Sequence, residues 1–236
     1  MTTIAANLQA IRGQIARAAQ DAGRSPSDVA LIAVSKAWPP ECIAEAYDCG
    51  QRAFGESYAH EGLAKMENLA QLPLEWHFVG PVQSNKTRAL AEHFHWVHSV
   101  ARVKIARRLS DARPEHLPAL NICIQVNVSG EASKSGVRPG EELALARTIL
   151  ELPRLKLRGL MAVPEPTADA ALQRQRFGLL RELKDRLVAS GIALDTLSMG
   201  MSADFEAAIL EGATMVRVGT AIFGCRLSRP GGEVSK

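Results

Sequence analysis

The stretch Val29-Ala30-Leu31-Ile32-Ala33-Val34-Ser35-Lys36 carries the first clear sign of the fold. It is a run of small and branched apolar residues that stops on a serine and a lysine, and Pro39-Pro40 follow shortly after it. Short apolar runs that end at such breakers are typical of strands buried within a sheet. We therefore predict a buried strand over 30–36 that ends on Lys36.

Outward from this strand, short apolar runs alternate with helical patterns along the chain. Before it, Ile4, Leu8, Ile11 and Ile15 repeat at three and four residues, which indicates a helix over 4–22. The helices predicted after it cover 41–49, 58–69, 85–92, 102–111, 141–150, 168–190 and 202–210. The strands predicted after it cover 52–56, 75–80, 96–99, 120–128, 156–163, 196–199 and 215–219.

Eight strands, each followed by a helix or a helical turn, predict an α/β protein folded as a (β/α)8 TIM barrel. The helix over 4–22 is extra to that pattern, and we expect it to cover one end of the barrel. An open, doubly wound sheet is the alternative, but no G-x-G-x-x-G follows the first strand, which argues against a dinucleotide-binding version. We expect a single domain over 1–227 and a disordered tail over 228–236.

The composition argues against several classes of protein. With 47% hydrophobic and 22% charged residues, the 236-residue chain can bury a sizeable core. A net charge of +3 gives little support for nucleic-acid binding, and no apolar run is long enough to span a membrane. The N-terminus lacks the pattern of a signal peptide, so we expect a cytoplasmic protein.

The four cysteines are Cys42, Cys49, Cys123 and Cys225. None forms a C-x-x-C pair, and none clusters with histidines at zinc spacing. We expect four free thiols in a reducing compartment and no metal site.

Lys36 is the first candidate for chemistry. A lysine at the carboxyl end of a buried strand can be partly desolvated, which lowers the pKa of its amine and makes it a nucleophile toward aldehydes. The product of that reaction is a Schiff base. An ordinary surface lysine explains this segment when it is taken alone, and the far end of the chain is what favours the chemical interpretation.

Closure of a barrel would bring Lys36 beside the last strand, where Arg217 alternates with apolar residues. Burying an unpaired charge is costly, so Arg217 needs a partner. That partner is either a ligand or, as the simpler alternative, a carboxylate or backbone carbonyl groups.

The loops after the last two strands carry small and hydroxylated residues. The first reads Ser198-Met199-Gly200-Met201-Ser202, and we expect Ser202 to be the N-cap of the helix that follows. The second reads Gly219-Thr220-Ala221-Ile222-Phe223-Gly224. Loops at these places in such barrels often bind phosphate, and ordinary turn chemistry is the alternative for each. An amine, an arginine and a phosphate cradle together match pyridoxal 5'-phosphate (PLP).

On these residues the chain resembles the pyridoxal phosphate homeostasis proteins, a family of single-domain barrels similar to the N-terminal domain of alanine racemase. Ser-Met-Gly-Met-Ser at 198–202 and Val-Arg-Val-Gly-Thr at 216–220 are highly specific in combination. Further stretches carry the resemblance in order along nearly the whole chain: Leu31-Ile32-Ala33-Val34-Ser35-Lys36, Phe54-Gly55-Glu56, Trp76-His77-Phe78-Val79-Gly80, Gln83-Ser84-Asn85-Lys86, Ser133-Lys134-Ser135-Gly136 and Arg158-Gly159-Leu160-Met161.

The resemblance implies a role for several residues. Lys36 would hold PLP covalently as an internal aldimine, and Arg217 would face the pyridine nitrogen. His77 and Asn85 would line the pocket, although a hydrogen-bonded core histidine explains His77 equally well. The phosphate would lie among residues of two loops: Ser198, Met199, Gly200, Ser202, Gly219 and Thr220.

Two positions depart from the family pattern. The family usually has asparagine and glutamine where this chain has Ser57 and His60. A contact made by that asparagine side chain would be shortened or lost here. Lys134 matches a lysine that the family often has in a mobile loop, and a solvated loop lysine is the simpler explanation.

Arg217 also bears on whether the protein is an enzyme. A guanidinium does not give its proton to a pyridine nitrogen, so it weakens PLP as an electron sink. Racemases of this fold add a tyrosine from a second domain of a partner subunit. This chain ends soon after the eighth strand, and its tyrosines, Tyr47 and Tyr58, lie in or at the start of predicted helices. Without a second acid–base group, efficient racemisation is not expected.

We therefore expect a protein of PLP homeostasis that stores or delivers PLP as a reversible Schiff base. The alternatives are a small PLP-dependent amino-acid racemase and a phosphate-binding barrel without pyridoxal. The expected partners are PLP and, as candidate recipients, PLP-dependent apoenzymes, with neither nucleic acid nor a membrane. The family resemblance implies a monomer.

Overall fold

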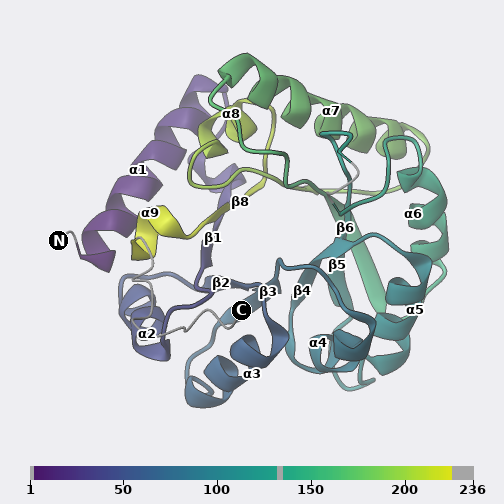
Figure 1. Cartoon of the computed structure of the whole chain (residues 1–236), viewed down its shortest axis with the longest axis horizontal. Helices are drawn as coiled ribbons and strands as arrows, with labels where there is room; N and C mark the ends of the chain where they lie inside the picture. The colour runs from purple at the N-terminus through teal and green to yellow at the C-terminus, as the bar shows by residue number, and fades with distance from the viewer. Residues whose placement is uncertain (1–2, 132–134, 225–236) are drawn as a thin grey trace, which may run out of the picture.

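Eight parallel strands close into a barrel in the computed structural model of the chain, which describes residues 3–131 and 135–224. The strands are β1 (Ala30–Val34), β2 (Ala53–Glu56), β3 (Glu75–Phe78), β4 (Trp96–Val100), β5 (Leu120–Gln125), β6 (Leu155–Met161), β7 (Thr196–Ser198) and β8 (Met215–Val218). Each strand pairs with the next in the sequence, and Figure 1 shows helices surrounding them.

The helices follow the strands in the predicted alternation. They are α1 (Ile4–Asp21), α2 (Pro40–Asp48), α3 (Ala59–Asn68), α4 (Thr87–His93), α5 (Val103–Ala112), α6 (Glu142–Leu150), α7 (Ala170–Ala189), α8 (Phe205–Leu210) and α9 (Thr220–Phe223), with short 3-10 turns η1 (Pro26–Asp28) and η2 (Ser84–Lys86). Most boundaries agree with the prediction to within a few residues.

The pairing of β1 with β8 closes the barrel. Ile32 lies opposite Arg217 and Ala33 lies opposite Val218 in a parallel register. The predicted (β/α)8 fold is therefore confirmed, and the open, doubly wound alternative is wrong. Closure also brings the strand that leads to Lys36 next to the strand that carries Arg217.

Helix α1 lies in the outer ring of helices, between α2 and α8, where Figure 1 shows it in purple. Its side chains reach the end of the chain: Asn7 Nδ2 donates a hydrogen bond of 2.8 Å to the carbonyl oxygen of Ile222 in α9. The expectation that this helix covers one end of the barrel was wrong. Helix α9 has only four residues, so α1 supplies the packing surface that a full eighth helix would give.

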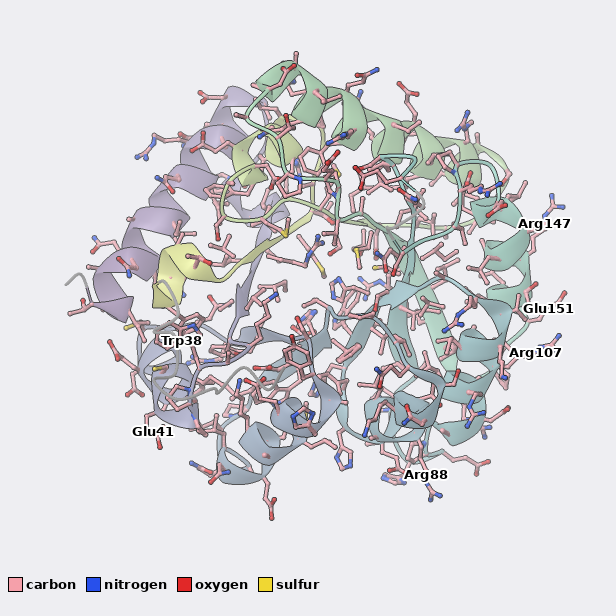
Figure 2. All side chains as sticks on the ribbon, in the orientation of Figure 1. Trp38, Glu41, Arg88, Arg107, Arg147 and Glu151 are labelled. Carbon is pink, nitrogen blue, oxygen red and sulfur yellow. The ribbon has the colours of Figure 1, made fainter. Side chains whose placement is uncertain are left out.

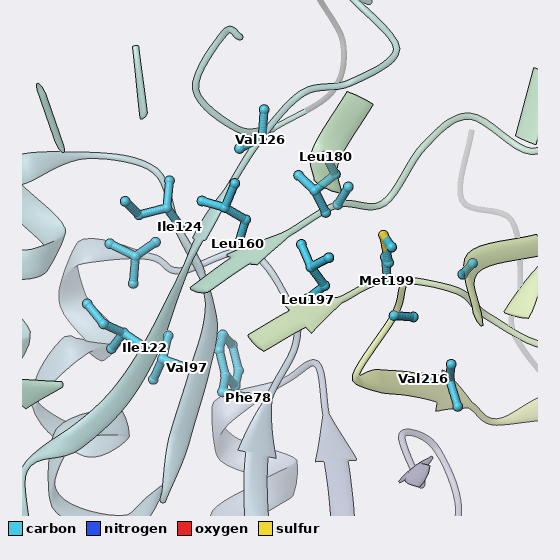
Figure 3. Close-up of a cluster of buried hydrophobic side chains, with 14 of the residues drawn as sticks. Phe78, Val97, Ile122, Ile124, Val126, Leu160, Leu180, Leu197, Met199 and Val216 are labelled. Atoms are coloured by element: carbon cyan, nitrogen blue, oxygen red, sulfur yellow. The ribbon is translucent and has the colours of Figure 1, made fainter. Parts of the chain in front are cut away.

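Side chains that alternate along the strands fill two layers. Those that point outward pack against the helices. Figure 3 labels members of this layer from the strands and the residues just after them, together with Leu180 of α7, which belongs to the same core: Phe78, Val97, Ile122, Ile124, Val126, Leu160, Leu180, Leu197, Met199 and Val216. Inside the barrel, Trp96, Cys123 and Met161 form a separate buried cluster. The barrel is thus filled with side chains below its mouth.

The segments after β7 and β8 differ from the prediction. The helix predicted to start at Ser202 begins at Phe205, and its N-cap is Asp204. The cause is a turn in which the backbone N–H of Met201 donates a 2.6 Å hydrogen bond to the Asp204 carboxylate. The segment predicted as a loop after β8 forms α9, which ends where Gly224 adopts a φ of 95°.

Three of the four cysteines are free thiols as predicted, namely Cys42, Cys49 and Cys123. The fourth, Cys225, and the tail predicted to be disordered over 228–236 lie outside the described residues. Over 3–131 and 135–224, the structure contains no helix with the length and apolar character needed to cross a membrane.

Candidate functional site

A pocket of about 320 Å³ lies at the carboxyl ends of the strands, the end at which such barrels carry their sites. Its size is that of a site for one small molecule. Residues that follow β1, β2, β3, β6, β7 and β8 contribute to its wall. The described lining residues are Val34, Lys36, Trp38, Ser57, Val79, Val163, Met201, Ser202, Ala203, Arg217, Gly219, Thr220 and Gly224.

Lys36 is half-buried in the pocket wall, two residues after the end of β1. The next residue, Ala37, has a φ of 65°, a left-handed conformation that is strained for any residue except glycine. Contacts on both sides hold this turn. The N–H of Ala37 donates to the Glu61 carboxylate, and the N–H of Ser35 donates to the carbonyl of Gly55 at 3.0 Å.

A buried ion cluster between β2 and α3 supports the same turn. Lys65 Nζ lies 2.8 Å from the carboxylate of Glu56 and 2.6 Å from that of Glu61. It also donates a 2.8 Å hydrogen bond to the carbonyl of Ser35, whose hydroxyl donates to Glu56 at 2.7 Å. Burial raises the pKa of Glu56, while Lys65 acts in the opposite direction. The cluster therefore fixes the residues on both sides of Lys36.

Arg217 points into the barrel from β8 and is only 4% exposed, yet it reaches the pocket wall. Its guanidinium donates 2.6 Å and 2.8 Å hydrogen bonds to the hydroxyl of Ser198 and the carbonyl of Ala162. Burial lowers the pKa of Arg217 to about 10, with the charge of Asp204 opposing the shift, so the side chain stays charged at neutral pH. Its partners are a hydroxyl and a backbone carbonyl.

Ser198 and His77 lie inside the barrel below Arg217, outside the described pocket wall. The Ser198 hydroxyl is 2.7 Å from Nδ1 of His98, and Nε2 of His98 is 2.9 Å from Nδ1 of His77. Burial lowers the pKa of both histidines, and that of His98 falls well below its ordinary value. For His77, this placement agrees with the alternative of a hydrogen-bonded core histidine.

The loop after β7 presents fewer side chains to the pocket than the sequence predicts. Met199 packs in the outer apolar layer, and Gly200 is buried with a φ of 92°. A Cβ on Gly200 would lie 2.7 Å from the side chain of Ala208, so only glycine fits there. Of the four residues predicted from this loop, Ser202 lines the pocket, and Met201 joins it.

Both residues predicted from the segment after β8 line the pocket. Gly219 allows the ends of β8 and β1 to approach, because a Cβ on it would lie 2.9 Å from the carbonyl oxygen of Val34. Thr220 is exposed and begins α9, whose N-terminus has no side-chain cap. The N–H groups at the start of a helix favour an anion.

Some residues that line the pocket were not predicted. Trp38, labelled in Figure 2, stacks on Phe223 of α9 with ring centroids 6.0 Å apart. Ser57, where the sequence departs from the family, also lines the pocket. Its backbone packs tightly on Gly80, because a Cβ on Gly80 would lie 2.2 Å from the carbonyl oxygen of Ser57. The available signal was their position directly after predicted strands.

Two residues singled out in the sequence do not reach the described site. Asn85 is exposed in η2 and does not line the pocket. Lys134 lies outside the described residues. His60, the second departure from the family pattern, is exposed and contacts the ring of Tyr58.

The arrangement combines a lysine amine, a guanidinium and small hydroxylated residues in one pocket. Lys36 and Arg217 are the only ionisable side chains in the described part of the wall. In the parts of the chain that the structure describes, no group of three or more His, Cys, Asp or Glu side chains could hold a metal ion. The pocket suits a small anionic ligand that carries an aldehyde.

Comparison with known proteins agrees with this geometry. Residues 6–227 match the family described as alanine racemase, N-terminal domain. A pyridoxal phosphate homeostasis protein of Pseudomonas aeruginosa is 59% identical over 226 residues, which cover 96% of this chain and 97% of that protein. This chain belongs to the pyridoxal phosphate homeostasis protein family. The resemblance noted in the sequence is thereby confirmed.

Other members of the family extend the match. The pyridoxal phosphate homeostasis protein of Escherichia coli K12 is 52% identical over 233 residues, which cover 96% of this chain and 98% of that protein. PipY of Synechococcus elongatus, solved with PLP bound, has a TM-score of 0.82 and 37% identity over 94% of this chain and all of its own. An alanine racemase of Clostridium difficile, at 17% identity, has a TM-score of 0.70 over 94% of this chain and 58% of its own, and shares the fold.

Proposed function

We propose that this protein binds PLP in the pocket at the barrel mouth and holds it by a reversible Schiff base on Lys36, as a storage or delivery protein of PLP homeostasis. The observation that carries the proposal is that Lys36 and Arg217, from opposite ends of the chain, line one cavity with Ser202, Gly219 and Thr220. Membership of the family supports it, because PipY has been solved with PLP bound.

The residues present fit each part of PLP. The aldehyde requires an amine, and the chemistry that PLP supplies when bound is Schiff-base formation with Lys36. The phosphate fits the hydroxyls of Ser202 and Thr220 and the uncapped start of α9. The ring nitrogen fits Arg217, which donates hydrogen bonds and accepts none.

The pocket wall favours a carrier over a racemase. Two-base racemisation needs a second acid–base group across from the lysine. Neither tyrosine of the chain lines the pocket: Tyr58 is 53% exposed, and the ring of Tyr47 lies against the guanidinium of Arg52. We infer that the protein holds PLP without efficient turnover, and that PLP-dependent apoenzymes are the class of recipient.

Visible absorption of the purified protein tests the proposal. The parent protein, loaded with PLP, should show the absorption band of a Schiff base, and Lys36→Ala should lack it. Lys104→Ala, which removes an exposed lysine of α5, is the matched control and should keep the band. A band that persists in Lys36→Ala would contradict the assignment of the amine.

Proton exchange at the α-carbon of L-alanine separates a carrier from a racemase. We expect exchange far below the usual enzymatic turnover of about 1–1000 per second. Turnover in that range, lost in Lys36→Ala, would replace the carrier with the racemase alternative.

A further inference from the structure

A continuous chain of polar side chains runs through the barrel from Arg217 at the mouth to Glu75 at the opposite end. Arg217 lies 2.6 Å from Ser198, Ser198 lies 2.7 Å from His98, and His98 lies 2.9 Å from His77. Nε2 of His77 then lies 3.6 Å from the carboxylate of Glu75. This series of hydrogen-bonded side chains crosses four strands, β8, β7, β4 and β3, beside the buried apolar cluster of Trp96, Cys123 and Met161.

The direction of the hydrogens in this chain follows from its upper end. A guanidinium only donates, so the Ser198 oxygen accepts from Arg217, and its own hydrogen goes to Nδ1 of His98. A neutral His98 then carries its proton on Nε2 and donates it to Nδ1 of His77. His77 in turn carries its proton on Nε2, which faces the Glu75 carboxylate.

The opposite direction is less favourable at both ends of the series. If His98 donated from Nδ1, the Ser198 oxygen would face two donors and its own hydrogen would lack an acceptor along the chain. The lone pair of His77 Nε2 would then face the Glu75 carboxylate at 3.6 Å, and two acceptors repel each other, whereas the first direction places an N–H there. This nitrogen is buried and has no hydrogen-bond partner within 3.5 Å among the described residues, so the charge of Glu75 decides which direction is favoured. Buried unsatisfied groups are costly, so the first direction is the stable one.

The carboxylate at the lower end is held in place. Trp96 Nε1 donates a 2.8 Å hydrogen bond to Glu75, and the guanidinium of Arg158, paired with Asp195, lies 4.7 Å from the centre of the Trp96 ring. The Glu75 side chain is 48% exposed, and contact with His77 is the main cause that lowers its pKa to about 2. The series of hydrogen-bonded side chains therefore ends on the Glu75 carboxylate, which stays ionised and is in contact with water.

The buried charge of Arg217 is stabilised by this series of hydrogen bonds, because no carboxylate among the described residues forms an ion pair with it. Each link directs a lone pair or the negative end of a dipole toward the guanidinium, and the links polarise one another. A hydroxyl whose hydrogen is committed to His98 is also a better acceptor for Arg217 than a hydroxyl that rotates freely. The two histidines thus orient the guanidinium without touching the pocket.

We propose that His98 and His77 are positioning residues, which fix the orientation of the Arg217 guanidinium through Ser198. Each group in the series, from Arg217 to His77, directs its hydrogen toward the next, and the last of them faces Glu75. The proposal rests on the proposed function, since it gives Arg217 its orientation toward the ring nitrogen of PLP. It predicts that changes at the buried His98 alter the affinity for PLP and the Schiff-base absorption, although His98 does not line the pocket.

The tautomers of the ligand-free protein give a direct test by nitrogen-15 NMR of the imidazole rings at about pH 7. His77 and His98 should both be neutral, with the proton on Nε2 and none on Nδ1. A proton on Nδ1 of His98, or on both of its nitrogens, would overturn the proposed order. This measurement needs neither PLP nor a variant that folds.

Two variants of one residue test the effect on the pocket. His98→Leu removes the acceptor for Ser198, and we expect PLP to bind about tenfold more weakly with a shifted Schiff-base band. His98→Asn keeps an acceptor near the position of Nδ1 and should restore both properties toward the parent. His95→Leu is the control, because it removes a neighbouring but exposed imidazole, which accepts a hydrogen bond from the backbone N–H of Trp76 and is not part of the series.

The outcomes separate this proposal from the proposed function. If the parent forms the Schiff base while His98→Leu and His95→Leu retain its band and affinity alike, the positioning role is excluded and the function stands. If the parent forms no Schiff base, the function fails, and a changed tautomer of His77 in His98→Leu would still show that the chain is coupled as described.

Discussion

Lys65 Nζ lies 2.8 Å from the carbonyl oxygen of Ser35 and donates a hydrogen bond to it, so a buried cation on α3 holds the backbone directly before Lys36. The same amine contacts Glu61, whose carboxylate accepts the N–H of Ala37 directly after Lys36. The strained turn that presents Lys36 is therefore held by an ion cluster that does not line the pocket.

Replacing Lys65 should destabilise the fold. Lys65→Met leaves two carboxylates without their cation, and breaking a buried pair in this way costs about 3–5 kcal/mol of unfolding free energy. Urea unfolding measures this loss. A second change, Glu56→Gln in the same chain, should recover part of it because it removes the uncompensated charge. A loss below about 1 kcal/mol, the value typical of an exposed pair, would contradict the structural role.

Reversing the charge at Arg217 should change the spectrum of bound PLP. Arg217→Glu allows the ring nitrogen to be protonated, so the Schiff-base absorption should shift while phosphate binding is largely kept. Arg102→Glu, at an exposed position before α5, is the control and should leave the spectrum unchanged. An unaltered spectrum in Arg217→Glu would mean that Arg217 does not lie at the ring.

The hydroxyls of Ser202 and Thr220 should strengthen the binding of PLP but not of pyridoxal, which lacks the phosphate. Ser202→Ala and Thr220→Ala should each weaken PLP binding about tenfold, since each removes a hydrogen bond to a charged group. Binding of pyridoxal should hardly change. Asn85→Ala should leave both affinities as they are, because Asn85 lies outside the pocket. Equal losses for the two ligands would place the phosphate elsewhere.

The free energy of unfolding should fall on acidification below about pH 6.5 because His77 and His98 are buried. Burial lowers the pKa of both below the ordinary 6.5, so the unfolded chain binds more protons than the folded one in this range. Between its pKa in the folded protein and its pKa in the unfolded chain, each histidine changes the free energy of unfolding by about 1.4 kcal/mol per pH unit. This stability is lost as the pH falls and is fully present above the unfolded pKa.

Denaturant unfolding of the parent and of His98→Asn between about pH 7 and pH 5 measures this slope. The variant should lose the share of one histidine. His95, whose pKa burial also lowers, contributes equally to both proteins. Identical slopes in the two proteins would show that His98 is not held neutral in the fold.

The fold was predictable because its signal is local and repeated. The apolar run before Lys36 and its seven successors are each short enough to read as strands, and the helices between them leave few alternatives to a barrel. The ends of the last two segments were less predictable. Helix α8 begins at Phe205 and not at the predicted Ser202, because the carboxylate of Asp204 accepts the N–H of Met201, three residues before it. Such a contact leaves no pattern in a sequence.

The candidate site was predictable where it depends on the ends of strands. Lys36, Ser202, Arg217, Gly219 and Thr220 all line the pocket, and all lie at or just after a predicted strand. The groups that support them could not be predicted. Lys65 meets Ser35 once β1, β2 and α3 have packed together, and His98 meets Ser198 across the barrel, so both interactions depend on tertiary structure.

Mass spectrometry after borohydride reduction tests the central claim most directly. Reduction converts a Schiff base into a stable secondary amine, so digestion of the PLP-loaded protein should yield a phosphopyridoxyl adduct on the peptide that contains Lys36. An adduct confined to other lysines, with the Lys36 peptide unmodified, would contradict the assignment of Lys36 as the amine that holds PLP.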